Sequence, residues 1–305
     1  MAKGRKRTAV CCVLLALLVF SGCEKDGGQD GSKGKKRKQA ETSEKSPSRQ
    51  GPPSGMVRVP AGKFKMGMKA SRGLTECKRY RNGCKEEWFA GQEPVHEVYL
   101  AEYYMDKHEV TEQEYDRCVK AGACDENEKK EGFSAPSQPV VNVSWHDARD
   151  YCEWAGKRLP TEAEWEKAAR GDDERIYPWG DNFAAGNANF CDRKCPFDWA
   201  WPAADDGHRF TAPAGRYPKG ASPYGALDMA GNVFEWVADR YDKNYYRYSP
   251  QRDPKGPDKG NHRVLRGGSW YFSAGLMQSA FRLHDSPESK DLNYGFRCAW
   301  PPRDL

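Results

Sequence analysis

The sequence predicts a mixed α+β domain in which short elements are joined by long, ordered loops. Turn-forming residues are frequent, with 30 glycines and 20 prolines among 305 residues. This punctuation and the 10 tryptophans argue against a helical bundle. Residues 56–305 suit one large domain that can bury a sizeable core.

Two segments have the apolar-polar alternation of β-strands. The first, 57–66, is interrupted at Pro60-Ala61-Gly62, which indicates a strand pair or a bent edge strand. The second, 95–105, is expected to form one further strand.

Three helices are predicted from their first residues. Thr111 and Glu114 form a capping box, and a hydroxyl residue opens each of the other two helices. A glycine follows each apolar face as a stop signal. The three segments run from Thr111 to Gly122, from Ser144 to Gly156 and from Thr161 to Gly171.

The first 22 residues have the features of a bacterial lipoprotein signal peptide. Basic residues precede the apolar run 9–20, and Ser21-Gly22-Cys23 follows it. A transmembrane anchor is the alternative, but the run is shorter than the roughly 20 residues that span a bilayer. We therefore expect lipid on Cys23 and a location in the cell envelope, with the domain in the periplasm or at the cell surface.

Residues 23–55 are expected to form a disordered tether, because they are rich in Lys, Gly, Ser, Gln and Pro and lack apolar periodicity. Residues 1–55 hold 12 basic and 5 acidic residues, against 37 and 39 in the rest of the chain. The domain itself is close to neutral, so the basic balance of the whole chain does not indicate a nucleic-acid partner.

Eight cysteines remain once Cys11, Cys12 and Cys23 are set aside. An even number in an exported domain indicates disulfides, although eight cysteines permit about 105 pairings. Zinc at Cys191 and Cys195 is the alternative, but no second ligand pair is evident.

Short motifs are spaced along nearly the whole domain. They read VRVPAG at 57–62, EVT at 109–111, VNVSW at 141–145, GKRLPTEAEW at 156–165, YPWG at 177–180, GNVFEW at 231–236, RGGSW at 266–270 and NYGFRC at 293–298. Together they resemble the formylglycine-generating enzyme, or sulfatase-modifying factor, family. The resemblance implies that family's α+β fold, which is related to C-type lectins and has much irregular backbone.

The resemblance also locates two cysteines that active members carry after Gly-Gly-Ser and that bind copper(I) for oxygen activation. Here those positions are Phe272 and Met277. A phenyl ring cannot coordinate copper and a lone thioether is a weak ligand, so we expect neither bound copper nor catalytic residues. The expected function is a non-catalytic or divergent binding module; the alternative is an oxygen-dependent oxidoreductase acting on a peptide or protein.

The resemblance also suggests where a ligand binds. Ser269 and Arg282 match residues that line the family's catalytic groove, and Trp270, Tyr271 and Phe272 would add aromatic surface beside them. Aromatic rings and an arginine suit a peptide, protein or glycan ligand. The alternative is that the rings fill the space that the copper ligands leave.

The resemblance further implies disulfides and structural calcium. It pairs Cys152 with Cys298, and the remaining cysteines are then expected to pair locally as Cys77–Cys84, Cys118–Cys124 and Cys191–Cys195. The implied calcium ligands are Asn189, Phe190, Asp206 and His208 at one site, and Asp228, Gly231, Val233 and Glu235 at the other. Phe190, His208, Gly231 and Val233 would contribute backbone carbonyls.

Overall fold

We describe residues 51–301 of a computed structural model of the protein. The expected signal peptide, Cys23 and most of the expected tether lie outside these residues. Within 51–301, no helix has the length and apolar character needed to cross a bilayer.

A bent antiparallel ribbon begins the described chain. Its strands are β1 (Met56–Val59), β2 (Gly62–Met66), β3 (His96–Leu100) and β4 (Tyr103–Asp106). β1 pairs with β4 and β2 with β3, and the register is unchanged across the break, since Val59 faces Tyr103 and Gly62 faces Leu100. The segment 57–66 is thus a bent strand, as predicted.

The prediction of one uninterrupted strand at 95–105 was wrong. Two residues, Ala101 and Glu102, separate β3 from β4. The Ala101 N–H donates to Asp253 Oδ1 at 2.8 Å. Pro60, in the break of the facing strand, has no N–H with which to continue the ladder.

The three predicted helices are confirmed as α2 (Glu112–Lys120), α3 (Trp145–Trp154) and α4 (Glu162–Arg170). Thr111, Ser144 and Thr161 each close a reciprocal capping box. A further helix, α1 (Ala70–Lys78), was not predicted. Its N-cap residue Lys69 makes no side-chain cap bond, so the usual start signal is missing.

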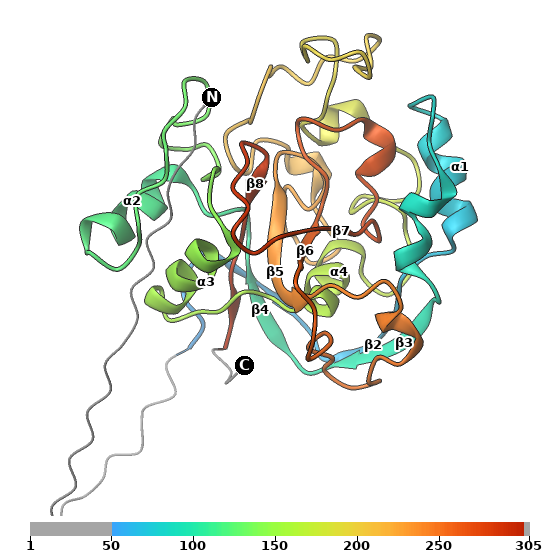
Figure 1. The fold of residues 1–305 in the computed structure, drawn as a ribbon, viewed down its shortest axis with the longest axis horizontal. Coiled ribbons are helices and arrows are strands. Elements are labelled where there is room, and N and C mark those ends of the chain that lie inside the picture. Colours follow the sequence, from blue (N-terminus) through green and yellow to red (C-terminus); the bar gives the residue numbers. More distant parts are fainter. Residues whose placement is uncertain (1–50, 302–305) are drawn as a thin grey trace, which may run out of the picture. The chain divides into compact units, whose positions relative to one another are not determined.

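A four-stranded sheet occupies the centre of the fold (Figure 1). Its strands, in spatial order, are β7 (Leu283–Asp285), β6 (Arg263–Arg266), β5 (Phe234–Arg240) and β8 (Tyr294–Gly295). β8 runs parallel to β5 and the other pairings are antiparallel. The last strand, β9 (Ala299–Trp300), joins β4. Figure 1 shows α2 and α3 on one side of this sheet and α1 on the other.

All four expected disulfides form. Cys152–Cys298 joins α3 to the C-terminal segment across 146 positions. The local pairs are Cys77–Cys84, Cys118–Cys124 and Cys191–Cys195. The zinc alternative for Cys191 and Cys195 is therefore wrong, because their sulfurs bond to each other.

Buried ion pairs fix α4 within the core. The pairs are Glu162–Arg282 at 2.6 Å, Glu164–Arg158 at 2.6 Å, Glu166–Arg266 at 2.6 Å and Glu166–Arg170 at 3.0 Å. All seven side chains are at most 3% exposed. Lys167 Nζ donates to the carbonyls of Pro60 and Gly62, which ties α4 to the ribbon as well.

We predict that Glu162→Gln lowers the free energy of unfolding by about 3–5 kcal/mol, because it leaves buried cations without their counter-charge. The control is Glu97→Gln, which removes the exposed pair with Lys63 and should cost less than about 1 kcal/mol. Urea unfolding of both variants gives the comparison, and equal losses would contradict this account of the core.

Candidate functional site

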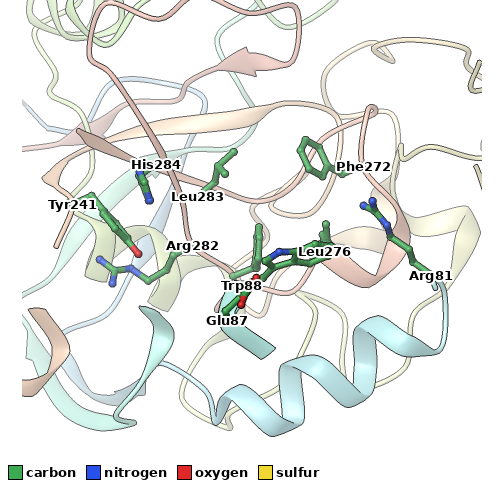
Figure 2. Close-up of a pocket in the computed structure, with 10 residues that line it drawn as sticks. Arg81, Glu87, Trp88, Tyr241, Phe272, Leu276, Arg282, Leu283 and His284 are labelled. Carbon is green, nitrogen blue, oxygen red and sulfur yellow. The ribbon is translucent and has the colours of Figure 1, made fainter. Parts of the chain in front are cut away.

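A cavity of about 420 Å³ lies between the segment that follows α1 and the segment that leads into β7 (Figure 2). It is lined by Arg81, Glu87, Trp88, Tyr241, Phe272, Leu276, Phe281, Arg282, Leu283 and His284. Figure 2 shows Arg81 at one end of the cavity and Tyr241, Arg282 and His284 at the other. The rings and aliphatic side chains lie between these polar ends, so the cavity suits a ligand with an apolar centre.

The two positions that the resemblance assigns to copper ligands have different surroundings. Phe272 lines the cavity and packs edge-on against Phe234, with ring centroids 5.2 Å apart. Met277 is fully buried and is not among the lining residues. A Cβ added to Gly268 would lie 2.6 Å from Met277 Sδ, so the thioether fills space against the backbone.

No thiolate is available to replace these ligands within residues 51–301. All eight cysteines of this segment are bonded in disulfides. Copper(I) prefers soft sulfur donors. The residues around the cavity therefore do not fit the copper centre of the family.

Arg282, one of the expected groove residues, lines this cavity, but its guanidinium is already bound. Nε and Nη2 donate to the two Glu162 oxygens at 2.6 and 2.8 Å, and Nη1 donates to the carbonyl of Gly91. Burial alone would lower the pKa of Arg282, but Glu162 outweighs this effect and the pKa is raised. Arg282 thus shapes the wall of the cavity while its charge is neutralised by the core.

The other three groove candidates lie elsewhere. Ser269 is fully buried, and its Oγ has no hydrogen-bond partner. Trp270 donates from Nε1 to the carbonyl of Leu292 at 3.0 Å and packs against Phe133. Tyr271 packs against Phe197, with ring centroids 4.5 Å apart. The structure therefore does not bring the four predicted groove residues together at one cavity.

Sequence reasoning missed the wall that carries Arg81, Glu87 and Trp88. This wall is the loop that the Cys77–Cys84 disulfide closes, together with the 3-10 turn η1 (Glu86–Trp88). The close spacing of two cysteines was the available signal for a rigid loop, but nothing in the spacing shows what the loop packs against.

Tyr241 and His284 form the opposite end and were also missed. Their rings stack with centroids 3.8 Å apart, and His284 Nδ1 lies 2.9 Å from Nδ1 of His262. Burial, followed by the neighbouring His262, lowers the pKa of His284. This end of the cavity therefore favours a neutral imidazole.

The first expected calcium site contains one amide oxygen without a partner and one carboxylate that is mostly buried. Asn189 is buried and its Oδ1 has no hydrogen-bond partner. The Asp206 carboxylate accepts the N–H groups of Phe190 and His208, each at 2.8 Å. Burial raises the pKa of Asp206 to about 7. The Phe190 N–H that binds Asp206 follows Asn189 directly in the chain, and an orphaned amide oxygen close in sequence to such a contact fits a hard cation.

The second expected calcium site fits less well. Arg297 binds both oxygens of Glu235 at 2.7 Å, and Trp165 Nε1 adds a third bond at 2.7 Å. Asp228 is buried near Glu109, whose two carboxylate oxygens have no hydrogen-bond partner. Burial, followed by Asp228, raises the pKa of Glu109 well above its usual range.

Gly231 and Val233 can contribute only backbone carbonyls to the second site. Side chains alone do not build a metal centre: residues 51–301 contain no group of three or more His, Cys, Asp or Glu placed to hold a metal. Calcium at either position would depend on backbone and amide oxygens.

Comparisons with known proteins agree with the motifs. A family model described as "Sulfatase-modifying factor enzyme 1-like domain" matches residues 39–302. The formylglycine-generating enzyme of Streptomyces coelicolor is 35% identical, over 80% of this chain and 88% of that protein. A serine/threonine-protein kinase pkn1 of Chlamydia caviae is 34% identical over 80% of this chain, but the match covers 37% of the kinase. The inactive C-alpha-formylglycine-generating enzyme 2 of Bos taurus is 40% identical, over 55% of this chain and 53% of that protein.

Solved structures show the same fold. PvdO from Pseudomonas aeruginosa superposes with a TM-score of 0.63 at 27% identity, over 80% of this chain and 93% of PvdO. Treponema denticola variable protein 1 gives a TM-score of 0.60 at 24% identity, over 81% of this chain and 95% of that protein.

Proposed function

We propose a non-catalytic binding function for this chain, which belongs to the sulfatase-modifying factor enzyme 1-like family. The observation that carries the proposal is the composition of the cavity at Phe272. A ring stands at a copper-ligand position, and every cysteine within residues 51–301 is oxidised in a disulfide. A relative described as inactive shares 40% identity over 55% of this chain, which supports the same conclusion.

The cavity supports binding because it is preformed and largely apolar at its centre. Phe281 and Leu276 are buried beneath it, and Phe272 and Leu283 add partly buried surface. Burying one large apolar side chain of a ligand contributes about 1.5–3 kcal/mol. A peptide segment that inserts such a side chain is therefore the ligand class we propose.

The alternative function is an oxygen-dependent oxidoreductase that acts on a peptide or protein. Similarity to the Streptomyces coelicolor formylglycine-generating enzyme over 80% of this chain favours it. That reaction would need a ligand set other than paired thiolates, and we therefore place binding first.

Attachment to the membrane is part of the proposal. We propose that Cys23 carries lipid and that the domain faces the periplasm or the cell surface of a bacterial envelope. Metabolic labelling with a radioactive fatty acid, which Cys23→Ser should abolish, tests this attachment. Label retained by the variant would contradict it.

We further propose structural calcium at the first site, through Asn189, Asp206 and the carbonyls of Phe190 and His208. Calcium at about 100 times its Kd should add about 2.7 kcal/mol of stability. Chelation should therefore lower the Tm of the full chain and should leave the Tm of the Asp206→Asn variant unchanged. The neighbouring Asp205→Asn, which alters a carboxylate paired with Arg193, is the control and should respond like the wild type. A wild-type Tm that is unchanged by chelation would contradict calcium binding.

The binding function is tested by selecting displayed random heptapeptides on the full chain. We expect enriched peptides that lose binding to Leu283→Trp, because the indole fills the cavity. Trp88→Ala should weaken binding of the same peptides for a different reason, because it removes a half-buried side chain from the cavity wall. Leu292→Trp places an equal substitution outside the cavity and should retain binding.

Circular dichroism and Tm establish that each variant is folded before its binding is compared. Enriched peptides that bind all four proteins equally would show that the cavity is not the binding site. A selection that enriches nothing on the wild type would contradict peptide binding itself.

A further inference from the structure

We infer that Arg81 is the specificity-determining residue of this cavity and that its ligand is a peptide with an acidic side chain beside a large apolar one. This inference rests on the proposed binding function. It assigns to the cavity a charge preference that the apolar centre alone does not give.

The Arg81 guanidinium is held in place without being neutralised. Its Cζ lies 5.4 Å from the ring centroid of Trp88 and 5.6 Å from that of Trp199. No carboxylate lies within 4 Å of it among residues 51–301. These contacts with the two indole rings favour one position of the guanidinium but leave its N–H groups without an anion. Arg282, at the other end of the cavity, is by contrast fully committed to Glu162.

Arg81 also lines a second hollow. That hollow has a volume of about 340 Å³ and is lined by Tyr80, Arg81, Asn82, Asp198, Trp199 and Ala200. The two hollows have Arg81 as a common lining residue, and we call them together the groove. A ligand that contacts both must pass Arg81. An extended peptide therefore fits better than an isolated small molecule.

The loop that carries Arg81 is preorganised. The Cys77–Cys84 disulfide closes it, and its base lies against the 3-10 turn η6 (Ala274–Leu276). A Cβ added to Gly275 would lie 2.7 Å from the Cys77 Cα, which shows how closely the two backbones approach. A cation held on such a loop pays little ordering entropy when it binds an anion.

Two acidic residues border the groove and do not cancel this cation. Glu87 lies 3.5 Å from Lys85, and both side chains are mostly exposed. Asp198 lines the second hollow, beyond the 4 Å limit of an ion pair with Arg81. The centre of the groove thus presents apolar surface next to one cation, which is complementary to an acidic residue that neighbours an aromatic or aliphatic residue.

The peptides selected on the full chain test this inference. We expect Asp or Glu to be enriched next to a large apolar residue. Each selected peptide is then synthesised with an amidated C-terminus, both as selected and with its acidic residue replaced by the corresponding amide. Fluorescence polarisation gives Kd for the wild type, Arg81→Gln and Arg81→Lys.

We expect Arg81→Gln to raise the Kd of the acidic peptide about tenfold and to change the Kd of its amide counterpart by less than about twofold. Arg81→Lys should lose part of the affinity, because an ammonium lacks the planar donor pair. The control is Arg79→Gln, an exposed neighbour that pairs with Glu76; it should bind both peptides like the wild type.

The outcomes separate this inference from the proposed function. Peptides that require the cavity but show no acidic preference would overturn only the role of Arg81. So would an Arg81→Gln variant that loses the same affinity for the acidic peptide and for its amide counterpart. Binding that Leu283→Trp and Trp88→Ala leave intact would overturn the cavity as the site. If no peptide is enriched and the wild type instead binds glycans on an array, with that binding abolished in Leu283→Trp, the ligand is not a peptide.

Discussion

The buried ion pairs of α4 are the interaction on which the rest of the structure depends. Three glutamates of one helix pair with four arginines, and these come from the loop before α4, from α4 itself, from β6 and from the segment before β7. Each partner taken alone would be a costly buried charge, so the segments are held in one arrangement or not at all. Much of the chain is irregular, and charge matching supplies order that regular hydrogen-bond ladders do not.

This arrangement also decides what the cavity can do. Glu162 withdraws Arg282 from ligand binding, and Met277 and Ser269 are enclosed in the interior. The remaining surface comes from Phe272 and from a disulfide-closed loop on the far side of the cavity. A preformed apolar hollow with a fixed cation at one end has the chemistry of recognition, and it lacks paired sulfur donors for copper.

The sequence predicted the features that depend on neighbouring residues. Capping boxes at Thr111, Ser144 and Thr161 gave three helices, because each box is complete within four residues. The strand at 95–105 was drawn too long because the break depends on Asp253, about 150 residues away. The cavity was predicted only in part for the same reason. Arg282 meets Glu162 across 120 positions, and no local pattern reveals that pairing.

The central claim is that this fold lacks the copper chemistry of its family, and Cu(I) titration with product analysis tests it most directly. The full chain, with its disulfides kept intact, is titrated with Cu(I) and then incubated with oxygen and a Cys-x-Pro-x-Arg peptide. The Streptomyces coelicolor relative is assayed in parallel. We predict no stoichiometric Cu(I) binding and no mass loss from cysteine to formylglycine. One tightly bound Cu(I) per chain together with an aldehyde product would contradict the account.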